Sequence, residues 1–184
     1  MTGVNVLVEA KQEYTNQLIT VLNSQIFKGI QSMYTASEEY CKEHNDKNIL
    51  KKFQLILSKT PNWSEDKVKH EFDRIKIESD CDYLEGLLTA IFVTHTKILA
   101  SIKSQQKNNN IEIDVPSGCH FLHKVYIECA RNFWKYPYLF ENLPSNVDKQ
   151  RNLYQAEQLI KESIMDTIRK LLPVQTVLKE YLGN

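Results

Sequence analysis

Apolar residues recur every three or four positions along most of this chain, which is the spacing of amphipathic helices. The clearest stripe consists of Leu84, Leu87, Leu88, Ile91, Phe92, His95, Ile98, Leu99 and Ile102. A second stripe consists of Leu153, Ala156, Ile160, Ile164, Ile168 and Leu171. The segments 84–102 and 153–171 are therefore predicted to be the central helices of the core.

The first third of the chain predicts one long helix and one short helix. Residues 4–40 keep the helical spacing throughout, with Gly29 as the internal weak point. A short helix over residues 49–57 is predicted to stop at Pro61, because proline disfavours helical backbone in the residue before it.

Three serines mark the starts of later helices. Ser64, Ser117 and Ser145 each precede a helical pattern, and a serine oxygen at that place accepts a hydrogen bond from a first-turn amide. Residues 138–146 are expected to form a loop, and a short final helix is expected after Pro173.

The polar run 104–110, SQQKNNN, is the one internal boundary that the composition indicates, and the IEIDV that follows is typical of a short extended segment. Neither side of this bridge looks complete alone. The prediction is a single domain over residues 1–184, all-α, forming one irregular helical bundle of about six or seven helices.

Composition narrows the function classes. The chain has 184 residues, 42% of them hydrophobic, and 23 basic residues balance 23 acidic ones. With a net charge of zero, the chain lacks the excess of basic residues that is typical of a dedicated nucleic-acid-binding protein. The four cysteines show no CxxC pair and are expected to be reduced thiols, and neither a secretory signal nor a membrane span is expected.

Cys119, His120 and His123 are the strongest candidates for chemistry. Cys119 and His123 are four residues apart on one predicted helix, so a metal ion could reach both, but no second ligand pair exists. Cys119 or Cys129 could also act as a nucleophile beside a histidine base. Packing of the helix face is favoured over both alternatives, and His95 is expected to be a core histidine.

No catalytic residue and no cofactor are predicted. The five glycines form neither a GxGxxG nor a P-loop pattern, which argues against nucleotide-dependent chemistry. The protein is therefore expected not to be an enzyme.

Basic and aromatic residues alternate near the end of the helix that Ser117 opens, and this arrangement suits a contact surface. The proposed interaction residues are Arg131, Phe133, Trp134, Lys135, Tyr136, Tyr138 and Phe140. The alternative is that these rings tuck under the following loop. If they are exposed, the neutral chain favours a protein partner over nucleic acid.

Three stretches carry a resemblance to a family encoded by nucleocytoplasmic large DNA viruses, the giant viruses of the mimivirus kind. They are VNVLVEAKQEYT at residues 4–15, DVPSGCHFLHKVYIECARNFWKYPYLFE at 114–141 and IKESIMDTIRKLLPVQTVLKEYLG at 160–183. The resemblance implies a viral protein, present in the host cytoplasm or the virion, that takes part in assembly or virion structure.

The leading expectation is thus a non-enzymatic structural or protein-interaction component of a large DNA virus. One alternative is a nucleic-acid-associated viral factor whose cations gather on one surface, namely Lys124, Arg131, Lys135, Arg151, Arg169 and Lys170. Another is a metal site at Cys119, His120 and His123. Partner identity and oligomeric state do not follow from the sequence.

Overall fold

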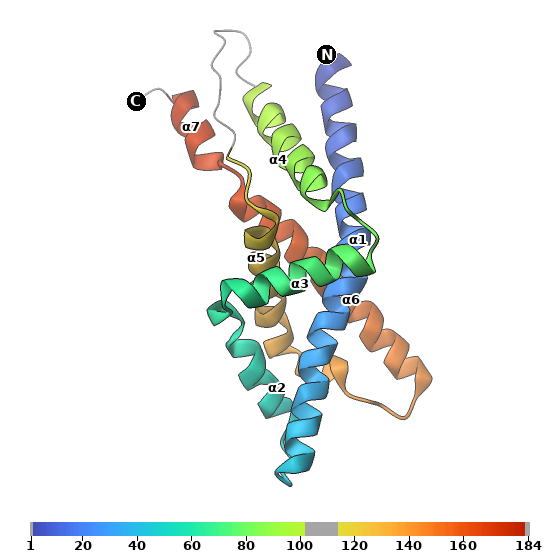
Figure 1. Cartoon of the computed structure of the whole chain (residues 1–184). Helices are drawn as coiled ribbons and strands as arrows, with labels where there is room; N and C mark the ends of the chain where they lie inside the picture. The colour runs from blue at the N-terminus through green and yellow to red at the C-terminus, as the bar shows by residue number, and fades with distance from the viewer. Residues whose placement is uncertain (1, 102–113, 183–184) are drawn as a thin grey trace.

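The computed structural model describes residues 2–101 and 114–182, and these residues form an all-α bundle without any β-strand (Figure 1). The predicted fold class is confirmed. The elements are α1 Thr2–Glu43, α2 Ile49–Ser58, η1 Thr60–Asn62, α3 Glu65–Glu78, α4 Leu84–Ser101, α5 Gly118–Lys135, η2 Pro137–Phe140, α6 Asn146–Leu171 and α7 Val174–Leu182, where η marks a 3-10 helix.

Helix α1 is the long axis of the molecule. It runs without interruption over 42 residues, about 63 Å at 1.5 Å per residue. Helices α2, α3, α4 and α6 all contact it. Figure 1 shows its two ends at opposite extremes, with α4 beside the first half, α7 on the other side of α4, and α2 near the second half. Distant parts of the chain are therefore gathered along one rod.

All three predicted serine caps are present. Ser64, Ser117 and Ser145 have extended backbone and accept hydrogen bonds from the amides of Lys67, His120 and Asp148. Each bond satisfies a first-turn amide that has no partner within its own helix. The short helix α2 also ends close to its prediction, with the turn η1 at Pro61 after it.

Helices α4 and α6 supply core residues as predicted, but α1 and α5, which were not predicted as central, make the most extensive contacts with the other helices. Helix α5 contacts α2, α3, α4 and α6 as well as both 3-10 turns. The side chains of Val125, Tyr126, Cys129 and Phe133 are fully buried. In α4 burial is strongest in the first half, since the second half extends toward the end of the bundle that holds the start of α1 and α7 (Figure 1).

Two smaller predictions also change. Residues 137–140 form the turn η2 where a plain loop was expected, because Phe140 and Leu139 pack inward. Leu153 is exposed, and the neighbouring Asn152 is buried in its place and donates to the Tyr138 carbonyl. The polar bridge 104–110 and most of the predicted extended segment lie outside the described residues.

A polar network joins α1, α3 and α5 at the middle of the bundle. The hydroxyl of the buried Tyr126 donates to Glu71, which also binds Arg74 through two hydrogen bonds of 2.6 and 2.9 Å. Arg74 reaches α1 through the backbone and side chain of Gln25, at 2.8 and 3.2 Å. Bidentate pairs of this kind are among the stronger polar contacts in proteins. The three helices are thereby fixed in register.

Gly29 lets this network approach α1. A β-carbon built at this position would lie 2.0 Å from the Tyr126 hydroxyl and 2.8 Å from a Glu71 carboxylate oxygen. Any larger residue must therefore displace the tyrosine or the helix. Gly29 is required for close packing, although by sequence alone it looks like a weak point of the helix.

Replacing Gly29 with alanine is predicted to destabilise the protein. Glycine to alanine inside a helix normally stabilises by up to about 1 kcal/mol, but here the clash should reverse the sign and cost roughly 1 to 3 kcal/mol. Urea unfolding would measure the change. Gly86→Ala is the control, since nothing lies within 4 Å of a β-carbon there. Equal effects at the two positions would contradict the packing role of Gly29.

His95 on α4 should make stability depend on pH. The side chain is half-buried, and burial, followed by the charge of Lys11, lowers its pKa to about 4 from the ordinary 6.5. Between these values the unfolded chain binds a proton that the folded chain does not, so the free energy of unfolding must fall as pH falls through this window. After allowance for its partial exposure we expect about 1 kcal/mol.

Urea unfolding at several pH values, compared between the protein and His95→Gln, isolates this contribution from other titrating groups. The substituted protein should lose less stability between pH 6.5 and pH 4. Parallel pH profiles for the two proteins would show that His95 titrates normally.

Candidate functional site

The aromatic segment at the end of α5 divides into an inward half and an outward half. Phe133 is fully buried, and Phe140 packs against it at 4.9 Å between ring centroids. Phe140 also contacts Phe27 and Phe53, each at 5.4 Å. Phe133 was predicted as an interaction residue, and this is wrong because its ring is fully buried in an aromatic cluster between α1, α2 and α5. Phe140 belongs to the same cluster but is half-buried, and its role in binding stays a prediction.

Trp134, Tyr136 and Tyr138 form the outward half, with 51%, 38% and 43% of their surface exposed. Lys135 is exposed as well, whereas the exposed Arg131 forms an ion pair of 2.7 Å with Glu128. Several exposed aromatic side chains on one segment are typical of contact surfaces. Whether these residues bind a partner stays a prediction.

Trp134 lines a groove that the sequence did not indicate. The groove has a volume of about 560 Å³ and lies between the end of α1, one side of α2 and the end of α5. Tyr40 and Leu55 provide further apolar walls and are 39% and 49% exposed. Lys51 and Lys52 add positive charge to the lining. We refer to this site as the Trp134 groove.

Hydrogen bonds fix the walls of the Trp134 groove. Gln54 on α2 donates to the Trp134 carbonyl at 2.8 Å, which satisfies an acceptor in the last turn of α5. The Lys52 ammonium lies 3.2 Å from the centroid of the Tyr40 ring, a cation–π contact. Asp46, in the lining, accepts two hydrogen bonds of 2.9 Å from Asn48. The groove is thus preformed.

Sequence reasoning missed Tyr40, Leu55, Lys51 and Lys52 because they are far from Trp134 along the chain. One signal was present. Leu55 falls away from the face of its helix that carries Phe53 and Leu57, and an apolar residue on a polar face is a sign of a second contact. The identity of the facing helix could not be read from spacing.

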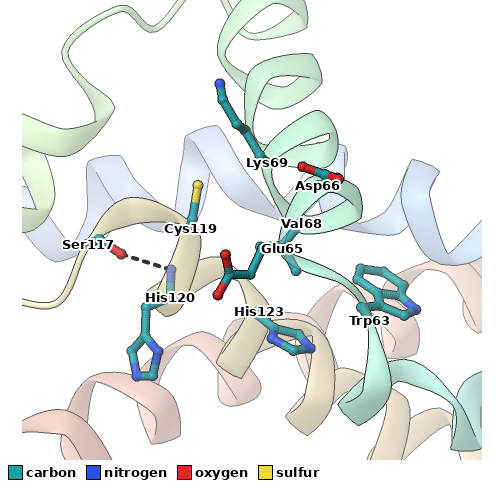
Figure 2. Close-up of a pocket in the computed structure, with 9 residues that line it drawn as sticks. All are labelled: Trp63, Glu65, Asp66, Val68, Lys69, Ser117, Cys119, His120 and His123. Carbon is teal, nitrogen blue, oxygen red and sulfur yellow. Dashed lines mark hydrogen bonds between the residues drawn. The ribbon is translucent and has the colours of Figure 1, made fainter.

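A second groove, of about 470 Å³, contains Cys119, His120 and His123 between the starts of α3 and α5. Figure 2 shows the Cys119 and His120 side chains pointing in opposite directions, with Glu65 between His120 and His123. The Nε2–H of His123 donates to the Thr60 carbonyl at 2.9 Å. Among the described residues, no three histidine, cysteine or acidic side chains are grouped as a metal ion requires.

The thiols of Cys119 and Cys129 are held in the neutral form. Burial raises the pKa of Cys119, with Asp73 and Glu85 adding to the effect against Lys69. Burial raises the pKa of Cys129 to about 12. A nucleophilic cysteine needs the opposite shift, because the thiolate is the reactive species. The surroundings of both cysteines therefore favour a packing role over the nucleophile hypothesis.

The six cations of the nucleic-acid hypothesis do not form one free surface. Lys124, Arg131 and Lys170 line a groove of about 630 Å³ between α5 and α6, but Glu128 pairs with both Arg131 and Lys170. The other three cations lie outside this groove. Arg151 forms an ion pair with Asp148, Arg169 forms one with Asp166, and Lys135 is next to Trp134 in the sequence. Much of the local positive charge is thus neutralised.

Thiol labelling tests the neutral state of the cysteines. Cys119 is partly exposed, whereas Cys41, Cys81 and Cys129 are buried. A thiol reagent at pH 8 should label Cys119 first, yet more slowly than it labels a small free thiol, because the raised pKa leaves less thiolate. Cys119→Ser should remove this phase. Labelling faster than the free thiol would restore the nucleophile hypothesis.

In the part of the chain that the structure describes, no helix is both long and apolar enough to cross a bilayer. Comparison with curated proteins and with solved structures finds no match. A family model does match residues 4–141, which include α1 to α5 and the exposed aromatic segment. The chain therefore belongs to the family of unknown function DUF5764.

Proposed function

We propose that this protein is a non-enzymatic protein-interaction component of a large DNA virus, present in the host cytoplasm or the virion. Its contact surface consists of Trp134, Tyr136 and Tyr138 together with the Trp134 groove. The observation that carries the proposal is the exposure of these rings on a backbone that the buried Phe133 and the half-buried Phe140 hold in place.

The rigid support argues for binding over chance exposure. Phe133 is buried in the core and the half-buried Phe140 packs against it, so contacts on either side of the three exposed rings hold the backbone between them. Rigid aromatic anchors of this kind dominate the energetics of many protein interfaces. A preformed surface also lowers the ordering cost of association.

The viral setting of the proposal is supported by the resemblance of residues 4–15, 114–141 and 160–183 to a giant-virus family. The middle stretch contains the three exposed rings. An assembly or virion role would give such a surface other viral structural proteins as partners.

Affinity purification from infected cells tests this function. The tagged protein should co-purify with virion structural proteins, and Trp134→Ala/Tyr138→Ala should reduce their yield by about tenfold or more, since loss of central aromatic anchors commonly costs over 1 kcal/mol each.

Ile77→Ala/Tyr83→Ala is the matched control, because these side chains are also exposed but lie on α3 and just before α4. Circular dichroism should show both variants folded. If virion proteins are absent from the eluate, or are retained equally by all three proteins, the proposal is wrong.

A further inference from the structure

We infer that the Trp134 groove binds a short acidic segment of a protein partner through one apolar anchor residue and flanking carboxylates. This inference rests on the proposed interaction function and specifies the chemistry of the partner. It depends on the charge around the groove, the exposed apolar walls and the fixed geometry of the lining.

Positive charge is concentrated in the segment that forms two walls of the groove. Residues 40–59 contain five lysines and two acidic residues, a net charge of +3 in a chain whose total is zero. Lys135, next to Trp134, adds another positive charge. An approaching acidic segment would be attracted to this end of the molecule.

The lysines nearest Trp134 form no salt bridge, although Lys52 lies over the Tyr40 ring in a cation–π contact. Within the described residues, Lys51, Lys52 and Lys135 have no carboxylate within 4.0 Å, unlike Arg131, Arg151 and Arg169. Asp46 is the acidic residue of the lining, and hydrogen bonds from Asn48, with a smaller effect of the Lys51 charge, lower the pKa of its carboxyl, so it stays ionised. The lining therefore carries two lysines against one carboxylate, a net positive charge.

The apolar walls of the groove determine which side chain of the partner can act as the anchor. Tyr40, Leu55 and Trp134 come from three different helices, and each exposes between 39% and 51% of its surface. A leucine or aromatic side chain inserted among them would remove all three from water. The volume of about 560 Å³ suits one or two such side chains.

A single nucleic-acid strand also combines aromatic stacking with positive charge, but the groove favours a peptide. A strand requires cations along a track that follows successive phosphates. Here two lysines stand beside the aliphatic Leu55, and Asp46 also lines the groove, so the cations do not form such a track. Carboxylates on a peptide can be spaced to avoid Asp46, whereas phosphates on a strand recur at fixed intervals.

Selection from a displayed library of random peptides of about twelve residues, the length of a typical recognition motif, tests the inference with the full chain as bait. Enriched peptides should carry excess Asp and Glu and at least one leucine or aromatic residue. A synthetic peptide of the enriched sequence should shift the ¹⁹F resonance of Trp134 in fluorotryptophan-labelled protein. The only other tryptophan, Trp63, should not respond.

Substitutions in the groove show which residues contribute to the affinity for the peptide. Lys51→Glu/Lys52→Glu and Trp134→Ala should each weaken the enriched peptide by about tenfold or more, and high salt should weaken it as well. The control Lys97→Glu/Lys161→Glu makes the same charge change on α4 and α6, outside the groove, and should alter affinity by less than about twofold. Circular dichroism confirms folding.

The inference would be overturned if no peptide is enriched or if the enriched peptides are neutral or basic. It would also be overturned if Lys51→Glu/Lys52→Glu leaves peptide affinity unchanged. Binding of a labelled oligothymidylate with the same sensitivity to these variants would overturn it in favour of single-stranded nucleic acid. If virion proteins are still captured by Lys51→Glu/Lys52→Glu but lost with Trp134→Ala/Tyr138→Ala, the proposed function stands and the acidic partner is excluded.

Discussion

The contact of Tyr126 with Glu71 across Gly29 is the constraint on which the rest of the bundle depends. It places a polar hydroxyl and a carboxylate between three helices, where each group would be costly without a partner. Burial and the neighbouring Glu71 raise the pKa of Tyr126 well above its ordinary value, so the hydroxyl keeps its proton and remains the donor. Arg74 then balances the Glu71 charge and extends the network to Gln25.

This arrangement also explains how one end of α5 supports a surface that α1 and α2 complete. The network fixes α5 against α1 near its middle, and the aromatic cluster around Phe140 fixes the end of α5 against α1 and α2. Two attachment points prevent α5 from rotating about its own axis. The outward direction of Trp134 is therefore set by contacts made elsewhere on the same helix.

The sequence predicted the helices well because their signals are local. Serine caps, proline stops and a 3.6-residue stripe act within one or two turns, and Ser64, Ser117 and Ser145 were each read correctly. The central place of α1 and α5 was missed, since burial depends on which helices meet. A regular stripe such as Leu84 to Leu99 shows that one face is apolar, but not how deeply it is covered.

The candidate site was predicted only in part, because its residues are brought together by tertiary contacts. The concentration of rings between Phe133 and Phe140 is visible in the sequence, yet Phe133 and Trp134 are adjacent and only the tertiary structure separates the buried ring from the exposed one. Tyr40 and Leu55 belong to other helices, so no spacing rule could join them to Trp134. Gly29 looked like a defect because its partner, Tyr126, is nearly a hundred residues away.

The hydrogen bond from Gln54 to the Trp134 carbonyl has a thermodynamic consequence for any ligand of the groove. Helix ends usually fray, and a ligand that binds there must first order the backbone, which costs about 1 to 2 kcal/mol for each residue fixed. Because Gln54 occupies this last-turn acceptor, the backbone at Trp134 is already ordered. Association then restricts mainly side-chain rotation at Tyr40, Leu55 and Trp134, so a short segment with few contacts can bind there with useful affinity.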